Sequence, residues 1–174
     1  YPDYKAGRRE KPALYVPLMD KLEESNASRW CKHDQLEADD LLGIMLTNGR
    51  VKNPILCSID KDLLGVPGWH YNWNKDDWPR GVTQAEADFH WLVQLLMGDS
   101  TDNIEGMKGI GIAKAQKLAS AYCEKMGTPL APIPAAQKIY EAEGFTLDAY
   151  KKCLMLISIW RSPMPAELLE NELI

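Results

Sequence analysis

The glycine-rich stretch GDSTDNIEGMKGIGIAKAQKL at residues 98–118 constrains the fold of this chain most strongly. Gly109 and Gly111 stand directly before a segment in which Ile112 and Ala115 follow helical spacing, so the sequence predicts a glycine hairpin followed by an amphipathic helix. Backbone amides in such a hairpin, together with the positive end of the helix dipole, can approach an anion closely. The stretch therefore indicates a phosphate-binding loop.

Lysines surround this hairpin and narrow the kinds of site it can form. A P-loop would place Lys before Ser or Thr after its last glycine, and a dinucleotide fingerprint would add a third glycine and a preceding strand; the stretch has neither pattern. A lone GxG is more often a helix cap followed by a turn, but the lysines and the spacing favour a helix-hairpin-helix unit that grips duplex DNA by its backbone. The predicted DNA-binding residues are Gly106, Lys108, Gly109, Gly111, Lys114 and Lys117.

Carboxylates form three short clusters, EADD, DKD and GDSTD, where predicted strands or helices begin or end. In SIDKD an extended backbone points Asp60 and Asp62 to the same side, and helix-like spacing does the same for Asp99 and Asp102. Any one cluster alone is more typical of ordinary helix caps. The complete set is Glu37, Asp39, Asp40, Asp60, Asp62, Asp99 and Asp102.

These seven carboxylates repel one another, and the sequence shows no balancing cations near them. Oxygen ligands suit hard divalent cations, so we expect two ions, Mg²⁺ or Mn²⁺, whereas the absence of clustered His or Cys excludes a typical zinc site. Two such ions about 4 Å apart activate water and stabilise the leaving oxygen in phosphodiester hydrolysis. The clusters therefore predict a metal site next to the phosphate-binding hairpin.

Hydrophobic periodicity predicts a strand-and-helix first part and an all-helical second part. A short helix around Leu14, Leu18 and Leu22 begins near Pro17, and a second helix presents Leu41, Leu42, Met45 and Leu46 on one face. Thr83 and Glu86 form a capping box for a helix that ends at Gly98, and Thr146 caps a last helix with Leu147, Tyr150, Leu154 and Ile157 inward.

Two short runs read as strands, and one stretch reads as a linker. NPILCSID is typical of a buried strand in a mostly parallel sheet, and WHYNW of a second strand. The three prolines of MGTPLAPIPAAQ are expected to block helix and sheet pairing. The four cysteines form no CxxC pair and are expected to be reduced core thiols.

The composition limits which classes of protein this chain can belong to. The 174 residues are 45% hydrophobic, enough for a real core, and no apolar run is long enough for a membrane helix or a signal peptide. The formal charge of −5 is uneven, because an acidic centre is flanked by two more basic margins. We expect an intracellular protein without a membrane partner.

In chain order, YKAGRREK, EADD, SIDKDL and GDSTDNIEGMKGIGIAKA resemble the flap endonucleases and 5′-to-3′ exonucleases, especially the small phage enzymes and the 5′ nuclease domain of bacterial DNA polymerase. The resemblance implies an α/β fold in which residues 1–97 form part of a PIN-like (resolvase-like) nuclease core with a mostly parallel sheet. Residues 98–174 would form a helical helix-hairpin-helix (H3TH) region. The EADD carboxylates would serve the first metal site, and the other four carboxylates the second.

The same resemblance implies roles for the remaining motifs. Lys5 and Arg8 would act as catalytic residues at the scissile or adjacent phosphate, and the hairpin carbonyls would hold a monovalent cation such as K⁺. The expected partner is duplex DNA with a 5′ end or 5′ flap, bound by a chain that is monomeric when complete and located in the cytoplasm of a bacterium or a phage-infected host.

The sequence departs from the family at its front, where two upstream aspartates have no counterpart. We therefore expect an N-terminally incomplete chain that binds DNA better than it cuts it. Two alternatives remain: a nuclease-derived DNA-binding module that has lost its chemistry, and an RNA-cleaving relative. The hairpin, which usually holds duplex DNA, argues against the second.

Overall fold

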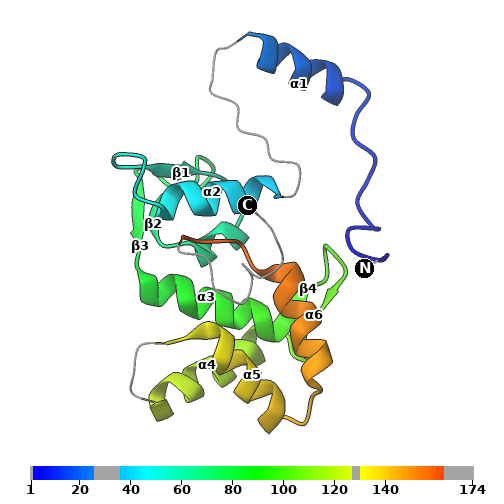
Figure 1. Ribbon diagram of the computed structural model, residues 1–174, viewed down its shortest axis with the longest axis vertical. Helices are drawn as coiled ribbons and strands as arrows, with labels where there is room; N and C mark the ends of the chain where they lie inside the picture. Colours follow the sequence, from blue (N-terminus) through cyan, green and yellow to red (C-terminus); the bar gives the residue numbers. More distant parts are fainter. Residues whose placement is uncertain (1, 26–35, 127–129, 163–174) are drawn as a thin grey trace.

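The computed structural model describes residues 2–25, 36–126 and 130–162, and Figure 1 shows how their elements are arranged. In chain order the elements are α1 Tyr15–Glu24, α2 Ala38–Thr47, β1 Ile55–Cys57, the 3-10 helix η1 Asp62–Gly65, β2 Gly68–Tyr71, β3 Arg80–Val82, α3 Gln84–Met97, β4 Gly98–Asp99, β5 Ile104–Glu105, α4 Ile112–Met126, α5 Pro132–Ala142 and α6 Leu147–Ile157. The small sheet and α2 lie on one side of the long central helix α3, and α4 and α5 lie on its other side.

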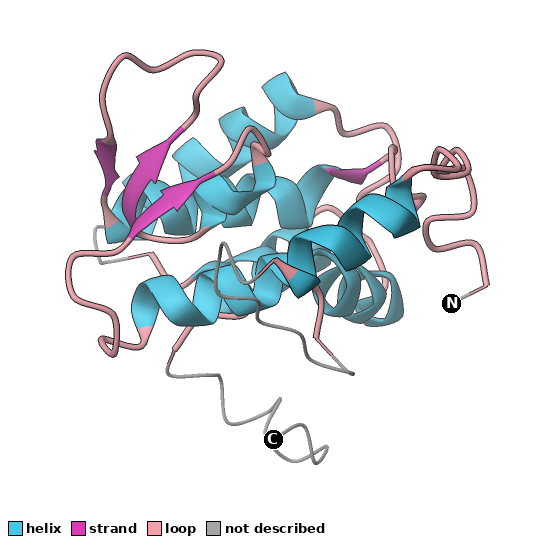
Figure 2. Ribbon diagram, turned by 90° about the horizontal axis from the view of Figure 1, so that it is seen from above, coloured by secondary structure: helices cyan, strands magenta, loops and turns pink. Residues whose placement is uncertain are grey.

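The three-stranded sheet has the order β1-β2-β3 and gathers at one side of the molecule in Figure 2. β1 pairs with β2 in parallel, whereas β2 pairs with β3 antiparallel because a short loop joins them. The sheet is therefore mixed where a mostly parallel one was expected. β1 is also less buried than predicted: Leu56 faces the interior, but Ile55 is 50% exposed because β1 is an edge strand with only one covered face.

Helix α3 organises both halves of the chain. Its capping box is present as predicted: Thr83 Oγ1 accepts the Glu86 N–H at 3.2 Å, and Glu86 Oε2 accepts the Thr83 N–H at 2.7 Å. The helix ends before Gly98, which has a φ of +72°. Leu92, Leu95 and Leu96 are fully buried, and the main core extends from them through α4, α5 and α6.

The predicted linker contains a helix instead. α5 begins at Pro132, because a proline in the first turn of a helix has no hydrogen bond to lose and its φ already suits the helix. Tyr140 of α5 is fully buried and donates a hydrogen bond from its hydroxyl to the Leu95 carbonyl oxygen at 2.8 Å. Thr146 caps α6 as predicted, with Tyr150 and Ile157 buried, but Leu147 is 40% exposed.

The first two helices form where predicted, but their apolar faces are not buried as expected. In α1, Pro17 lies in the first turn and none of the residues is buried. In α2 the buried residue is Gly43, where an added Cβ would lie 2.3 Å from the Trp160 carbonyl oxygen. The close approach of the backbone at residues 159–160 turns Leu42 and Met45 outward, to 37% and 41% exposure.

Two further expectations concern cysteines and membranes. Among the described residues the free thiols are buried only at Cys153, while Cys123 is half-buried and Cys57 is exposed on edge strand β1. Cys31 lies outside the described residues. In the part of the chain that the structure describes, every helix is too short or too polar to cross a membrane.

Candidate functional site

The sequence-predicted carboxylates meet at one cavity of about 320 Å³ between the two halves of the chain. Its walls are completed by α6 and the extended residues that follow it. Asp60 lies beside this set, and its Oδ1 accepts the Asp62 N–H at 3.0 Å. The carboxylates that line the cavity are Glu37, Asp39, Asp40, Asp62, Asp99 and Asp102.

The EADD carboxylates are positioned by the start of α2. Glu37 is the N-cap, and its N–H donates to Asp40 Oδ2 at 3.2 Å in a capping box. Asp40 Oδ1 also accepts the Trp160 N–H at 3.1 Å, so this side chain joins α2 to the segment after α6. Burial and the neighbouring carboxylates raise the pKa of Asp39 and of Asp40. The capping alternative therefore applies in part to this cluster.

Asp62 occupies the most electrostatically unfavourable position of the described carboxylates. It opens η1 directly after β1, and its Oδ1 accepts a hydrogen bond from Gln94 Nε2 at 2.7 Å. Burial, together with the charges of Asp60, Asp99 and Asp102, raises the pKa of Asp62 to about 6. Sequence reasoning missed Gln94, although a polar residue among the buried leucines of α3 was a usable signal.

Asp99 and Asp102 lie on a two-stranded ribbon and its turn, where helix-like spacing was predicted. Asp99 ends β4, and its Oδ1 accepts the Thr101 N–H at 2.7 Å. The tight turn still brings both carboxylates to the same cavity, so the predicted convergence holds although its predicted cause was wrong.

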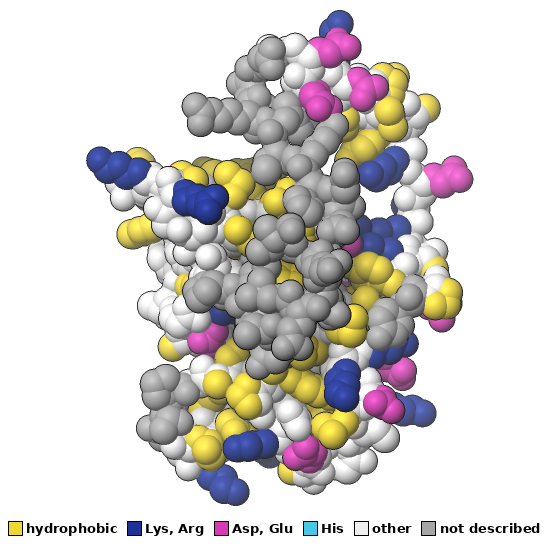
Figure 3. Space-filling model, viewed as in Figure 1, with side chains coloured by type: hydrophobic (Ala, Val, Ile, Leu, Met, Phe, Trp, Pro, Cys, Tyr) yellow, Lys and Arg dark blue, Asp and Glu magenta, His cyan; other side chains and the backbone are white. Residues whose placement is uncertain are grey.

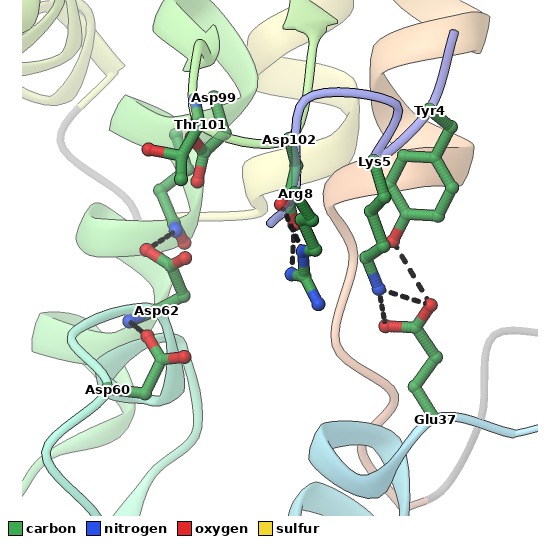
Figure 4. A network of polar contacts seen from close by, with 10 residues as sticks. Tyr4, Lys5, Arg8, Glu37, Asp60, Asp62, Asp99, Thr101 and Asp102 are labelled. Carbon is green, nitrogen blue, oxygen red and sulfur yellow. Dashed lines mark hydrogen bonds and ion pairs between the residues drawn. The ribbon is translucent and has the colours of Figure 1, made fainter. Parts of the chain in front are cut away.

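Two cations of the N-terminal segment, Lys5 and Arg8, contact this set directly (Figure 4). Lys5 Nζ donates to both carboxylate oxygens of Glu37. Arg8 forms a bidentate pair with Asp102, with Nε–Oδ1 at 2.9 Å and Nη2–Oδ2 at 2.8 Å. The expectation that no balancing cation stands near the carboxylates was therefore wrong, because folding brings residues more than 30 positions apart into contact.

The glycine hairpin combines one closely packed glycine with two open ones. An added Cβ at Gly106 would lie 2.3 to 2.7 Å from backbone atoms of the preceding strand and helix, so this glycine serves close packing. At Gly109, whose φ is +78°, and at Gly111 nothing lies within 4 Å of such an atom. Lys108, Lys114 and Lys117 are exposed around them. The backbone here is accessible to a large ligand.

Figure 3 shows how charged and hydrophobic side chains are distributed over one face of the molecule. On the face that it shows, outside the grey atoms, Lys and Arg side chains are scattered singly among hydrophobic and acidic ones. The hairpin itself borders an open hollow of about 640 Å³ that runs from Met97 to Gly111.

Comparison with known proteins relates this arrangement to nucleases. The chain is 30% identical over 115 residues to the exonuclease of Escherichia phage T7, 31% over 138 residues to DNA polymerase I of Treponema pallidum, and 28% over 144 residues to the 5′-3′ exonuclease of Mycoplasma pneumoniae. These matches include 63%, 70% and 70% of this chain. The predicted resemblance to 5′ nucleases is confirmed.

The fold agrees with solved structures of 5′ nucleases. The T5 5′-exonuclease, in a mutant form, and a T5 protein co-crystallized with metal ions each superpose with a TM-score of 0.60, at 17% and 18% identity. They cover 91% of this chain, which covers 66% and 69% of theirs. The predicted fold class, a partial PIN-like core with a helical region, is thus confirmed.

The chain matches only part of the length of each of these 5′ nuclease relatives. The chain spans 38%, 14% and 48% of the lengths of the phage T7, Treponema and Mycoplasma proteins. No protein-family model matches it.

This 5′ nuclease-like site has ligands of the type that a metal ion needs, but not the spacing. The ligand types fit, because oxygen donors in a partly buried, negatively charged cavity suit a hard divalent cation. The spacing does not: within residues 2–25, 36–126 and 130–162, no three His, Cys, Asp or Glu side chains form a group that could hold an ion.

Proposed function

We propose that this chain carries the carboxylates and the DNA-binding hairpin of a divalent-metal-dependent 5′ nuclease that hydrolyses DNA phosphodiester bonds. The observation that supports the proposal most is the convergence of six carboxylates, from three separate segments, on one cavity. Such convergence is costly for caps alone, because burial and the charges of neighbouring carboxylates raise the pKa of Asp39 and of Asp62. Relatives named exonuclease add independent support.

Each group has a role in this proposal. Two Mg²⁺ or Mn²⁺ ions would supply an activated water and stabilise the leaving oxygen. The EADD cluster would hold one ion, and Asp60, Asp62, Asp99 and Asp102 the other. Lys5 and Arg8 carry the positive charge that the scissile or adjacent phosphate needs, and Arg8, 57% exposed, can reach a ligand in solvent.

The hairpin would hold the duplex away from the cavity. Open backbone at Gly109 and Gly111, flanked by exposed lysines, suits phosphate contacts that carry no sequence information. A 5′ end or 5′ flap would then be directed towards the carboxylates, and carbonyl oxygens of the hairpin could also hold K⁺.

A metal titration tests the central claim. Calorimetric titration of the native chain with Mn²⁺ should show binding that weakens strongly in the Asp60→Asn, Asp99→Asn double variant. The matched control is Asp20→Asn with Asp77→Asn, which removes the same charge from two exposed positions outside the cavity. Equal Mn²⁺ binding by the native chain and the Asp60, Asp99 variant would overturn the metal assignment.

A second candidate is a DNA-binding module without nuclease chemistry, and the lack of a three-ligand group within residues 2–25, 36–126 and 130–162 favours it. Cleavage of a 5′-flap DNA duplex in Mg²⁺ separates the two candidates. Cleavage that the Asp60→Asn, Asp99→Asn variant loses supports the nuclease. If a chain with an intact hairpin binds the flap DNA but does not cleave it, the result supports the DNA-binding module. Cleavage of an RNA duplex in preference to DNA would contradict both candidates.

A further inference from the structure

The N-terminal strap, defined as residues 3–8, is fastened to the turn that carries Asp102. The Lys5 N–H donates to the Asp102 carbonyl oxygen at 3.0 Å, and Asn103 Nδ2 donates to the Asp3 carbonyl oxygen at 3.1 Å. Tyr4 packs against the main core, and its hydroxyl donates to Glu37 Oε1 at 3.1 Å. The strap therefore bridges α2 and the β4–β5 turn at the rim of the carboxylate cavity.

Side chains of the strap neutralise two of the carboxylates that line the cavity. Lys5 is 23% exposed and Glu37 50%, while Arg8 is 57% exposed and Asp102 only 16%. Both cations use two hydrogen bonds, which takes up both oxygens of each carboxylate. Oxygens that accept from Lys5 or Arg8 have fewer lone pairs to offer another cation.

From these contacts we propose that the strap is an internal competitor for divalent cations: Lys5 and Arg8 occupy Glu37 and Asp102 in the free protein and must leave before an ion binds there. The proposal rests on the proposed function and adds a regulation of the same site.

The backbone of the strap suits a contact that can open. Lys5 has a φ of +59°, a left-handed conformation that residues other than glycine rarely adopt and that surrounding contacts must hold. The contacts that hold it are the ones named above together with two hydrogen bonds inside the strap, from the Ala6 N–H to the Asp3 carbonyl oxygen at 3.2 Å and from the Arg8 N–H to the Lys5 carbonyl oxygen at 3.1 Å. The two ion pairs lie at a partly exposed rim, where solvent weakens them. Release of the strap from this rim would expose two cations together.

We expect DNA to favour the release of the strap. A DNA phosphate can take Lys5 and Arg8 away from the carboxylates, because guanidinium and ammonium groups bind phosphate oxygens as readily as carboxylate oxygens. Whatever phosphate binding adds to ion affinity, ion binding must add to phosphate affinity. The strap would thereby couple the arrival of DNA to the loading of the metal.

Metal binding without DNA tests the competition. We compare Mn²⁺ titrations of the native chain, the Lys5→Ala, Arg8→Ala double variant, and the control Arg9→Ala, which removes a positive charge one residue further on, at an exposed position. Two partly exposed ion pairs predict roughly 2- to 30-fold tighter Mn²⁺ binding by the double variant than by the control. Equal or weaker binding would overturn the proposal.

A second measurement uses the native chain and so does not depend on the stability of a variant. The Lys5 amide should be protected from hydrogen exchange while it donates to Asp102, and Mg²⁺ at saturating concentration should remove that protection. Protection that persists with Mg²⁺ bound would show that the strap stays closed and would overturn the proposal.

The failure of this proposal differs from the failure of the proposed function. If all variants bind Mn²⁺ with one affinity, only the competition is wrong. If none of them binds Mn²⁺, both the metal site and the competition are wrong. Binding that appears only after Lys5 and Arg8 are removed would support both.

Discussion

Gly106 offers the sharpest test of how the hairpin is built. Its sequence position predicts a DNA-contacting glycine, but the structure packs it against Gly98 and the end of α3. An added Cβ would lie 2.3 Å from the Met97 carbonyl carbon, 2.4 Å from the Gly98 nitrogen and 2.7 Å from the Leu96 carbonyl oxygen. All three are backbone atoms, so a rotamer change cannot relieve the overlap in Gly106→Ala.

The cost of Gly106→Ala follows from this geometry. Relief requires β4 and β5 to move apart until the shortest contact grows from 2.3 Å to about 3.4 Å. Overpacking of this kind costs about 1–3 kcal/mol, and the 2.8 Å hydrogen bond from the Met107 N–H to the Leu96 carbonyl oxygen, worth about 1 kcal/mol, would be lost. Together these terms give about 2–4 kcal/mol, a drop in Tm of roughly 4–16 °C for a chain of this length.

Thermal denaturation of Gly106→Ala and Gly111→Ala measures the difference between a packed and an open glycine. An added Cβ at Gly111 meets nothing within 4 Å and its φ is not left-handed, so Gly111→Ala should keep the native Tm. A Gly106→Ala variant that melts with the native chain but loses duplex affinity would refute the packing argument and restore the DNA-contact prediction.

Three further predictions concern the hairpin, the α3 ion pair and a buried histidine. Lys114→Ala should weaken binding to all duplex sequences alike and reduce the salt slope by about 1, measured by fluorescence anisotropy; a sequence-dependent loss would contradict it. Arg161→Ala should lower the free energy of unfolding in urea by about 3–5 kcal/mol. Arg161 Nη1 lies 2.6 Å from Asp88 Oδ1, and its removal would leave the nearly buried Asp88 without its ion-pair partner. An unchanged free energy of unfolding would refute this prediction. Burial lowers the pKa of His70 from its usual 6.5, so on acidification the unfolded state binds this proton before the folded state does. The free energy of unfolding should therefore decrease as the pH is lowered from 6.5, and it should decrease less steeply in His70→Gln. Identical slopes in the two proteins would refute this prediction.

Local signals in the sequence predicted much of the fold. The capping box of Thr83 and Glu86, the stop at Gly98 and the cap at Thr146 were confirmed, because each depends on atoms within four residues of one another. Helix α5 was missed because its prolines were taken as breakers, although a proline in the first turn is compatible with a helix. The outward turn of Leu42 was missed because its cause, the backbone near Trp160, lies far away in the sequence.

In the candidate site, too, local motifs predicted some features, whereas contacts between distant residues were missed. Four ordered motifs were enough to predict which carboxylates converge, and the cavity contains six of the seven. The pairing of Arg8 with Asp102 joins positions 94 residues apart, and no periodicity or local pattern reports on such a contact. Gln94, which donates to Asp62, was missed although its place among the buried leucines of α3 was a usable signal.

The carboxylates of this chain do lie close to positive charge, as their number predicts. Carboxylates packed this closely need positive charge among them, and the sequence argument assigned that charge to metal ions alone. In the folded chain Lys5 supplies it at Glu37 and Arg8 at Asp102, while Asp62, which has no such partner and whose pKa rises to about 6, shows where charge remains uncompensated. Among the carboxylates that line the cavity, Glu37 and Asp102 are thus paired with cations of the strap, whereas Asp62 is not. If the proposed ions bind, one near Asp62 would displace neither Lys5 nor Arg8, whereas one at Glu37 or Asp102 would need the strap to be released.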